Sequence, residues 1–262
     1  MRSILLLIIL CATCYSGLSQ DLSAFEKKTF TSTAGHELPY RILYPKNYDT
    51  NKKYPLLLFL HGAGERGNNN EGQLVHGSKL FIDPVNREKY PAIVIFPQCT
   101  TEGYWSSVSI DRTQSPLALE FDYSKPITPD LQAAIELVQK VMATESVDKS
   151  RVYIAGLSMG GMGTFEAVYR YPDLFAAAVP ICGGADLNAY DKRVSKIPFR
   201  VYHGAKDAVV DVKHSKTIVE KLKILNTSVE YFEYPEVNHN SWDNAFAEPD
   251  FLSWIFSKSR KK

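Results

Sequence analysis

The residues with the clearest chemical potential form the pentapeptide GLSMG, from Gly156 to Gly160. It follows the strand-like VYIA and opens a helix-like stretch, which is the context of a nucleophile elbow. Such a turn strains the serine backbone and exposes the hydroxyl, while the glycines avoid Cβ collisions with neighbouring elements. The helix start adds partial positive charge. We therefore predict Ser158 as a nucleophile, and an incidental serine in a glycine-rich turn is the alternative.

A serine hydroxyl needs a general base, and three histidines follow Ser158 in the chain. His203 lies at a strand end in FRVYHG, where we expect it to be packed. His214 lies in the lysine-rich DVKHSK, where we expect it to be solvated. His239 lies in VNHNSW, just past the last strand candidate, where a loop can carry it over the sheet. We predict His239 as the base, and a surface loop histidine is the alternative.

The base in turn needs a carboxylate to orient it. Behind a G-x-S-x-G elbow the chain order is serine, acid, histidine. Asp207, in YHGAKDAVV, follows a strand candidate and is the predicted acid, with Asp211 second and Glu236 third. Asp207 is expected to accept a hydrogen bond from one ring nitrogen of His239. That bond fixes the tautomer, so the other nitrogen can take the Ser158 proton.

A second glycine-rich segment, FLHGAGERG at 59–67, contains the G-x-G-x-x-G spelling of dinucleotide-binding turns. Such a turn must open a helix, but NNNEGQ follows and makes a poor helix start. The acid about 20 residues on, Asp83, precedes Pro84 and has no strand leading to it. The loop suits an oxyanion hole better. We predict the backbone N–H groups of Ala63 and Met159 as its donors.

The elements that must position these residues alternate between strand-like and helix-like segments. Continuous apolar runs such as PLLLFL and AIVIF indicate strands buried on both faces, hence a mainly parallel sheet between helix layers. The first two candidates alternate more and suit an antiparallel sheet edge. The predicted strands are Phe25–Thr31, Leu38–Tyr44, Tyr54–Leu60, Ala92–Phe96, Val152–Leu157, Ala176–Ile181, Phe199–His203 and Val229–Tyr234. The predicted helices cover 129–141 behind a Thr128 cap, 159–170, 212–225 and 250–256.

The composition excludes several classes of protein. The 262 residues are 45% hydrophobic and 23% charged, which is typical of a globular chain. The formal net charge of +1 provides no strong basic field, so we expect no nucleic-acid partner. No internal repeat, low-complexity tract or linker is visible, and the length suits one large α/β domain.

The N-terminus carries the pattern of a secretory signal peptide. Arg2 precedes an apolar run from Ile4 to Cys14, and small residues follow. The run is shorter than the ~20 apolar residues that a membrane-spanning helix needs. We expect a signal peptide at 1–20 and a catalytic domain at 21–262, secreted or periplasmic, without stable membrane insertion. A short membrane anchor is the alternative.

Together, GLSMGG, HGAGERGNNNEGQLVHG, FPQC followed by GYW, HGAKDAVV and VNHNSWDNAF resemble the α/β-hydrolase superfamily. The resemblance is to its secreted serine esterases, such as feruloyl and acetylxylan esterases. It extends to bacterial proteins described as predicted peptidases or phospholipase/carboxylesterases, and it covers about 25–256. It implies an eight-stranded, mainly parallel sheet with helices on both faces. It also implies the roles given above to Ser158, Asp207, His239, Ala63 and Met159, and no cofactor. No zinc-binding motif is present in the sequence.

The fold implied by the resemblance separates Cys99 from Cys182. Two strands would lie between the strands that precede them, a distance of roughly 14 Å at ~4.8 Å per strand. A disulfide requires Cα atoms within about 7 Å. We therefore expect both cysteines of the mature chain to be free and buried.

The substrate is expected to be a small-molecule or polysaccharide-linked ester, with carbohydrate-linked acyl or feruloyl esters favoured. Some relatives carry a large cap domain between the sixth and seventh strands, but 183–196 is too short for one, so the site should be open. The long segment 100–127 contains aromatic residues that can line a pocket or pack the segment down. The candidate substrate contacts are Arg66, Gln73, Trp105 and Trp242; Trp242 also suits a packing role beside His239.

Two other functions compete with an esterase. The first is a serine peptidase of the prolyl-oligopeptidase-like type acting on short peptides, although the chain has no room for the propeller domain that such enzymes usually add. The second is a catalytically silent carbohydrate-binding module. The complete serine, acid and histidine set argues against the second.

Overall fold

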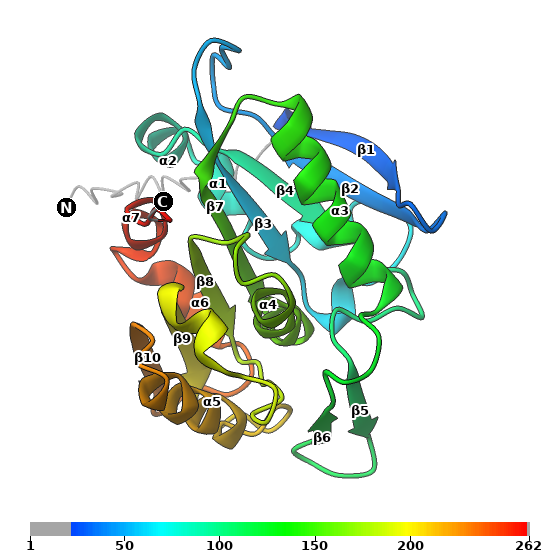
Figure 1. Cartoon of the computed structure of the whole chain (residues 1–262), viewed down its shortest axis with the longest axis vertical. Coiled ribbons are helices and arrows are strands. Elements are labelled where there is room, and N and C mark those ends of the chain that lie inside the picture. The colour runs from blue at the N-terminus through cyan, green and yellow to red at the C-terminus, as the bar shows by residue number, and fades with distance from the viewer. Residues whose placement is uncertain (1–21, 261–262) are drawn as a thin grey trace, which may run out of the picture.

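The computed structural model describes residues 22–260 and is built around one eight-stranded sheet (Figure 1). The strand order is β1-β2-β4-β3-β7-β8-β9-β10. β2 pairs antiparallel with β1 and β4, and all other neighbours are parallel. This confirms the predicted sheet and its antiparallel edge. The strands are β1 (Phe25–Thr31), β2 (Glu37–Leu43), β3 (Tyr54–Leu60), β4 (Ile93–Pro97), β7 (Val147–Leu157), β8 (Ala177–Ile181), β9 (Phe199–Gly204) and β10 (Val229–Tyr234).

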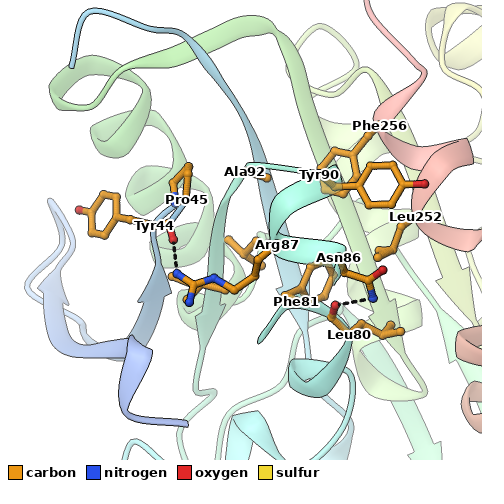
Figure 2. Close-up of a pocket in the computed structure, with 12 residues that line it drawn as sticks. Tyr44, Pro45, Leu80, Phe81, Asn86, Arg87, Tyr90, Ala92, Leu252 and Phe256 are labelled. Carbon is orange, nitrogen blue, oxygen red and sulfur yellow. Dashed lines mark hydrogen bonds between the residues drawn. The ribbon is translucent and has the colours of Figure 1, made fainter. Parts of the chain in front are cut away.

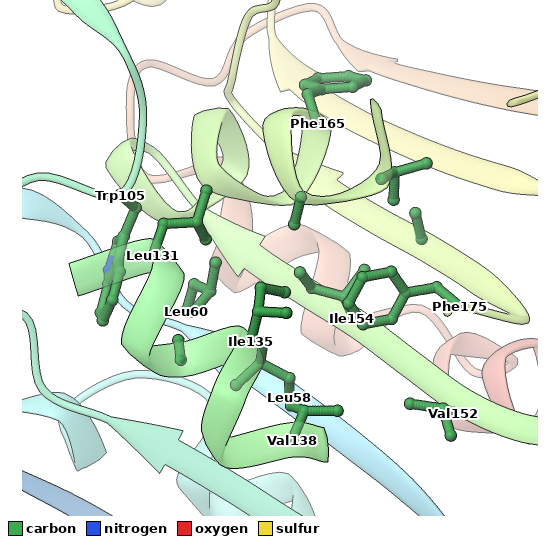
Figure 3. Close-up of a cluster of buried hydrophobic side chains, with 14 of the residues drawn as sticks. Leu58, Leu60, Trp105, Leu131, Ile135, Val138, Val152, Ile154, Phe165 and Phe175 are labelled. Atoms are coloured by element: carbon green, nitrogen blue, oxygen red, sulfur yellow. The ribbon is translucent and has the colours of Figure 1, made fainter. Parts of the chain in front are cut away.

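Helices cover both faces of the sheet because the inner strands are apolar on both sides. Every residue of β3 is buried, and its side chains alternate between two cores. Leu58 and Leu60 point to the core beneath α3 (Pro129–Thr144) and α4 (Met159–Arg170), which Figure 3 shows. α5 (Lys213–Ile224) contributes to the same core. The opposite core lies against α1 (Ser78–Ile82), α6 (Ser241–Ala247) and α7 (Phe251–Phe256).

Helix α3 begins as its sequence predicts. The Thr128 side chain accepts a hydrogen bond from the Leu131 N–H at 3.3 Å, and Pro129 occupies the first turn. Leu131, Ile135 and Val138 face the core on one side of the helix (Figure 3). The helix therefore packs across β3 and β7 through a single apolar stripe.

The structure contains elements that the sequence patterns did not predict. α1, α2 (Pro84–Lys89) and α6 are short helices that polar residues begin or interrupt. Asp83 caps α2 through the N–H groups of Val85 and Asn86 at 3.0 Å, so the acid considered for nucleotide binding is a helix cap. The long segment 100–127, in which no strand was predicted, contains a hairpin of β5 (Val108–Asp111) and β6 (Ala118–Phe121).

Cys99 and Cys182 are free and buried, as predicted. β3 and β7 lie between the strands that precede them, β4 and β8. The predicted signal peptide lies outside the described residues. Within 22–260, no helix combines the length and apolarity needed to cross a bilayer.

Candidate active site

Ser158 occupies a strained turn between β7 and α4. Its φ of 53° and ψ of −117° lie in a region that residues with a Cβ rarely adopt. A Cβ on Gly156 would stand 2.3 Å from the Gly160 carbonyl oxygen, and one on Gly160 would stand 2.0 Å from that of Leu60. Only glycines allow the turn to be this close to β3, so the GLSMG spelling has a steric cause.

The structure brings the predicted serine, base and acid together. His239 Nε2 lies 2.9 Å from Ser158 Oγ, and His239 Nδ1 lies 2.8 Å from Asp207 Oδ2. The three residues follow β7, β9 and β10, whose carboxyl ends meet at one edge of the sheet. A carboxylate can only accept, so Nδ1 carries the ring proton and Nε2 is free to accept the serine proton.

Asp207 is buried and ionised. Burial acts to raise the pKa of its carboxyl group, but hydrogen bonds from His203 and His239 outweigh that effect and hold the pKa well below its usual range. Its other oxygen accepts the N–H groups of Val209 and Val210, both at 2.9 Å. The acid is therefore fixed in place by its own loop and keeps the charge that holds the His239 ring.

The other two histidines after Ser158 have different partners. His203 is buried as predicted, with Nδ1 2.7 Å from Ser215 Oγ. Its Nε2 lies 2.9 Å from the Val210 carbonyl oxygen and 3.2 Å from Asp207 Oδ2, so this ring supports the acid from behind. The prediction that His214 is solvated is wrong. Its ring is half-buried against Phe121, with centroids 5.7 Å apart, because the β5–β6 hairpin reaches back over α5, and burial lowers its pKa.

The two alternative acids make other contacts. Asp211 accepts the Lys213 N–H at 2.9 Å and pairs with the Lys213 ammonium at the start of α5. Glu236 forms an exposed ion pair with Lys206. Neither of these alternatives is hydrogen-bonded to His239.

Both predicted oxyanion donors begin a helical turn beside Ser158. Met159 is the first residue of α4, and Ala63 is the first residue of the short 3-10 helix η2 (Ala63–Glu65). The first N–H groups of a helical turn have no partner within it. A Cβ on Gly62 would lie 3.7 Å from Ser158 Cβ, so this loop passes directly against the elbow. The arrangement suits stabilisation of a negative oxygen at Ser158.

His61 is a site residue that the sequence analysis missed. The ring is buried, and its Nε2 accepts the Cys99 N–H at 2.9 Å. Nδ1 therefore carries the proton and donates to the Gly62 carbonyl oxygen at 2.6 Å, on the same peptide whose N–H belongs to Ala63. Burial lowers the pKa of His61 to about 4, which keeps the ring neutral at pH 7. The signal was its place in FLHG, directly between a buried strand and the glycine loop.

The structure corrects two of the four predicted substrate contacts. Gln73 is completely buried, and its amide donates to the Asn70 side chain within the loop. Trp105 is also completely buried, edge-on to His61 with centroids 5.4 Å apart. The buried Glu166 carboxylate explains the position of Trp105. It accepts the Ser107 N–H at 2.6 Å and thereby draws this segment against α4.

Arg66 and Trp242 are partly exposed at the site and stay predictions as substrate contacts. Arg66 donates to the carbonyl oxygens of Ala63 at 3.0 Å and Gly103 at 3.2 Å. Trp242 meets the His239 ring edge-on with centroids 5.4 Å apart, and on its other side it contacts His76 at 5.1 Å. Trp242 thus also packs against the histidine loop, as the alternative for this residue predicted.

A separate pocket lies at the opposite edge of the sheet (Figure 2). Ala92, one of its lining residues, precedes β4, whereas Ser158 follows β7. Because β4 and β7 run in the same direction, the two residues lie at opposite edges of the sheet. Arg87 and Asn86 are hydrogen-bonded to the carbonyl oxygens of Tyr44 and Leu80 along its walls. Its interior is about 10 Å³, too small for an organic ligand.

The fold and the serine, histidine and acid geometry define an α/β-hydrolase. The model of the phospholipase/carboxylesterase family matches residues 110–252, more than half of the chain. The protein therefore belongs to this family. The matched segment contains Ser158, Asp207 and His239. The prediction of an ester hydrolase is confirmed at the level of the family.

Known proteins resemble the chain to different extents. A thermostable esterase of known structure is 36% identical with a TM-score of 0.81, over 90% of this chain and 64% of that one. A CE1 ferulic acid esterase from Anaeromyces mucronatus, solved with ferulic acid, shares the fold at 19% identity and a TM-score of 0.65, over 89% and 90%. A probable dipeptidyl-aminopeptidase B of Ajellomyces capsulatus is 25% identical over 85% of this chain. The chain spans about a quarter of that peptidase, 26% of its length.

Proposed function

We propose that the protein is an exported serine hydrolase that cleaves carboxylic esters through an acyl-enzyme intermediate. The observation that carries the proposal is the hydrogen-bonded chain from Ser158 through His239 to Asp207, with distances of 2.9 and 2.8 Å. Its chemistry needs no metal or cofactor, because the chain itself supplies nucleophile, base and oxyanion donors.

The proposed reaction has two halves. His239 Nε2 takes the Ser158 proton as Oγ attacks the ester carbonyl carbon, and the developing oxyanion meets the N–H groups of Ala63 and Met159. Collapse of this intermediate breaks the bond to the alcohol, which leaves with the proton from His239. Water then attacks the acyl-enzyme by the same route, with His239 again as base, and the acid product leaves.

The site suits an ester on a bulky or polymeric alcohol. The connection between β8 and β9 has only a short 3-10 turn, η4 (Lys192–Lys196), and Ser158 and His239 are both partly exposed. We favour carbohydrate-linked acyl or feruloyl esters as substrates. The shared fold with a ferulic acid esterase supports this choice.

A serine peptidase acting on short peptides is the second candidate. The dipeptidyl-aminopeptidase similarity, over 85% of this chain, favours it. The two candidates share the nucleophile and base, and they differ in the leaving group, an alcohol or an amine. Hydrolysis of a peptide library at a rate above that of any ester would select the peptidase.

We further propose that residues 1–20 direct export and are removed, leaving the protein secreted or periplasmic. The charged start, short apolar run and small residues support this. The mass of the protein recovered after expression of the full chain tests it. Retention of residues 1–20 on a membrane-bound product would contradict it.

The decisive experiment measures turnover of p-nitrophenyl acetate, methyl ferulate, acetylated xylan and peptides by the mature chain. We expect ester hydrolysis, and we expect a fluorophosphonate probe to label the wild type but not Ser158→Ala. Absence of turnover on every ester would overturn the proposed function. Equal labelling or equal activity of Ser158→Ala would overturn the role of Ser158.

A further inference from the structure

The mechanism leaves Cys182 unused, although it lies directly behind the proposed acid and base. It follows β8, is fully buried, and has a φ of 42°, which is uncommon for a residue with a Cβ. Its N–H donates to the Tyr202 carbonyl oxygen at 2.8 Å, which holds the backbone in this conformation. Strained residues of this kind concentrate at functional sites, so the thiol warrants an explanation.

Three potential metal ligands converge at this point. The Cys182 sulfur, a carboxylate oxygen of Asp207 and a ring nitrogen of His239 all lie within 4.8 Å of one another. Nδ1 is the ring nitrogen next to Asp207, at 2.8 Å. The buried Ser241 hydroxyl interacts with the Cys182 thiol, yet it has no hydrogen-bond partner of ordinary geometry within the described residues. A buried oxygen is thus available beside the sulfur.

These donors match one class of ion. Zn²⁺ binds cysteine sulfur, histidine nitrogen and carboxylate oxygen, and sites with three protein ligands leave a fourth position open. The thiolate selects thiophilic ions such as Zn²⁺ and Cd²⁺ over Mg²⁺ and Ca²⁺, which prefer oxygen. We propose that Cys182, Asp207 and His239 form a binding site for a thiophilic divalent cation, and that its occupation switches off the hydrolase.

Occupation would disable the base through its tautomer. Coordination at Nδ1 replaces the hydrogen bond to Asp207, and the ring proton then resides on Nε2, facing Ser158. Nε2 can no longer accept the serine proton. The Cys182 S–H bond breaks, a sulfur–metal bond forms and the proton leaves to solvent, with no change in oxidation state. The ion enters beside His239, the one partly exposed member of the three ligands.

The inhibitory part rests on the proposed function, but binding does not, so binding is measured first and on an inactive protein. Cd²⁺ is titrated into the mature Ser158→Ala chain by calorimetry in two buffers of different ionisation enthalpy. We expect one Cd²⁺ per chain and release of at least one proton, because a cysteine thiol is protonated at neutral pH and must lose its proton to bind a metal. Mg²⁺ should give no comparable site.

Two variants in the same background identify the ligand. Cys182→Ala should weaken Cd²⁺ binding by at least ~10-fold, since even loss of an outer-shell partner costs about that much. Cys99→Ala is the matched control, a second buried free cysteine outside the cluster, and should bind as before. Equal affinity of the Cys182→Ala variant overturns the site. If that variant does not fold, Cys182→Ser replaces it, and binding to the parent without proton release also overturns the site.

Inhibition is then measured as the ratio of ester hydrolysis with and without Cd²⁺ or Zn²⁺. The ratio should fall for the wild type and for Cys99→Ala, and return with EDTA. It should stay near one for Cys182→Ala. Cd²⁺ binding that leaves the wild-type rate unchanged overturns the switch. A wild type that binds Cd²⁺ but hydrolyses no ester overturns the proposed function and leaves the binding site standing.

Discussion

Two histidines flank Ser158 in opposite environments. His61 opens the oxyanion loop, residues 61–67, and is 1% exposed with both ring nitrogens bonded to backbone groups. His239 closes the base loop, residues 235–239; its side chain is 20% exposed, and its nitrogens meet two side chains, Asp207 and Ser158. The residue type is the same, but the partners differ.

The difference shows how environment divides one residue type between two tasks. A buried ring between backbone groups stays neutral and holds a peptide in place, whereas a partly exposed ring beside an ionised carboxylate can gain and lose a proton. The loops differ in the same way. The oxyanion loop is fixed by the Arg66 side chain, by the hydrogen bond from the Gly67 N–H to the Cys99 carbonyl oxygen, and by Gln98, whose amide donates to the Glu65 carbonyl oxygen. The base loop meets the acid loop, residues 205–212, through side chains: Asn238 accepts the Ala208 N–H, and Glu236 pairs with Lys206 on the exposed side.

The largest loss of activity is expected when Asp207, the acid that orients His239, loses its charge. Asp207→Asn retains an oxygen for the N–H groups of Val209 and Val210 but presents an amide to His239 Nδ1, which favours the wrong tautomer. We expect kcat to fall by about 10⁴-fold with a smaller change in KM. Steady-state kinetics on p-nitrophenyl acetate measure this. A loss of less than about tenfold would show that Asp207 does not orient the base.

A substitution in the oxyanion loop should lower kcat by a smaller factor. His61→Ala removes the bond that orients the Gly62–Ala63 peptide, and we expect kcat to fall by about 10- to 100-fold, within the range for a misplaced donor. His61→Asn keeps a donor near the position of Nδ1 and should recover part of that loss. Kinetics of both variants decide the point. Equal activity of the two would mean that the ring fills space and does not position the peptide.

The pH dependence of stability tests the buried environment of His61. The unfolded chain protonates His61 near pH 6.5, whereas the folded protein protonates it only near pH 4. Its contribution to the free energy of unfolding is therefore complete above pH 6.5, declines as the pH falls to 4, and is constant below that. The gap corresponds to about 3 kcal/mol. Urea unfolding of wild type and His61→Asn should give a stability difference that shrinks over this range, and a pH-independent difference would contradict the assignment.

The sequence predicted the sheet and the proximity of Ser158, Asp207 and His239 for identifiable reasons. Strands such as β3 are apolar throughout, which predicts burial on both faces and hence a sheet between two helix layers. GLSMG has a steric requirement at each glycine, and the order of serine, acid and histidine selected Asp207 and His239. The GLSMG motif is a local signal, and the order of serine, acid and histidine can be read along the chain.

What escaped prediction depends on contacts between distant segments. The role of His61 requires the Cys99 N–H, 38 positions away. Trp105 and Gln73 look like loop residues in sequence, but Glu166 and Asn70 draw them into the interior. The hairpin β5–β6 has half-buried strands with weak alternation, and its place is set by the bond from the Leu117 N–H to Val209. Single-sequence patterns carry no such pairings.

The smallest loss of activity is expected for Asn238, an exposed residue that helps to hold the base loop in position. Asn238 accepts the Ala208 N–H at 2.9 Å and the His239 N–H at 2.8 Å, so its side chain joins the acid loop to the base loop. A bond of this kind contributes about 0.5–1.5 kcal/mol. Asn238→Ala should therefore lower kcat by about 2- to 10-fold. Asn240→Ala is the matched control, since Asn240 is also exposed but, among the described residues, its side chain is hydrogen-bonded to Asp243 within its own helix start. If both variants lose activity equally, the base loop is held as a whole and Asn238 has no special part in it. If neither loses activity, the packing of Trp242 against His239 is sufficient to keep the base in reach of Ser158.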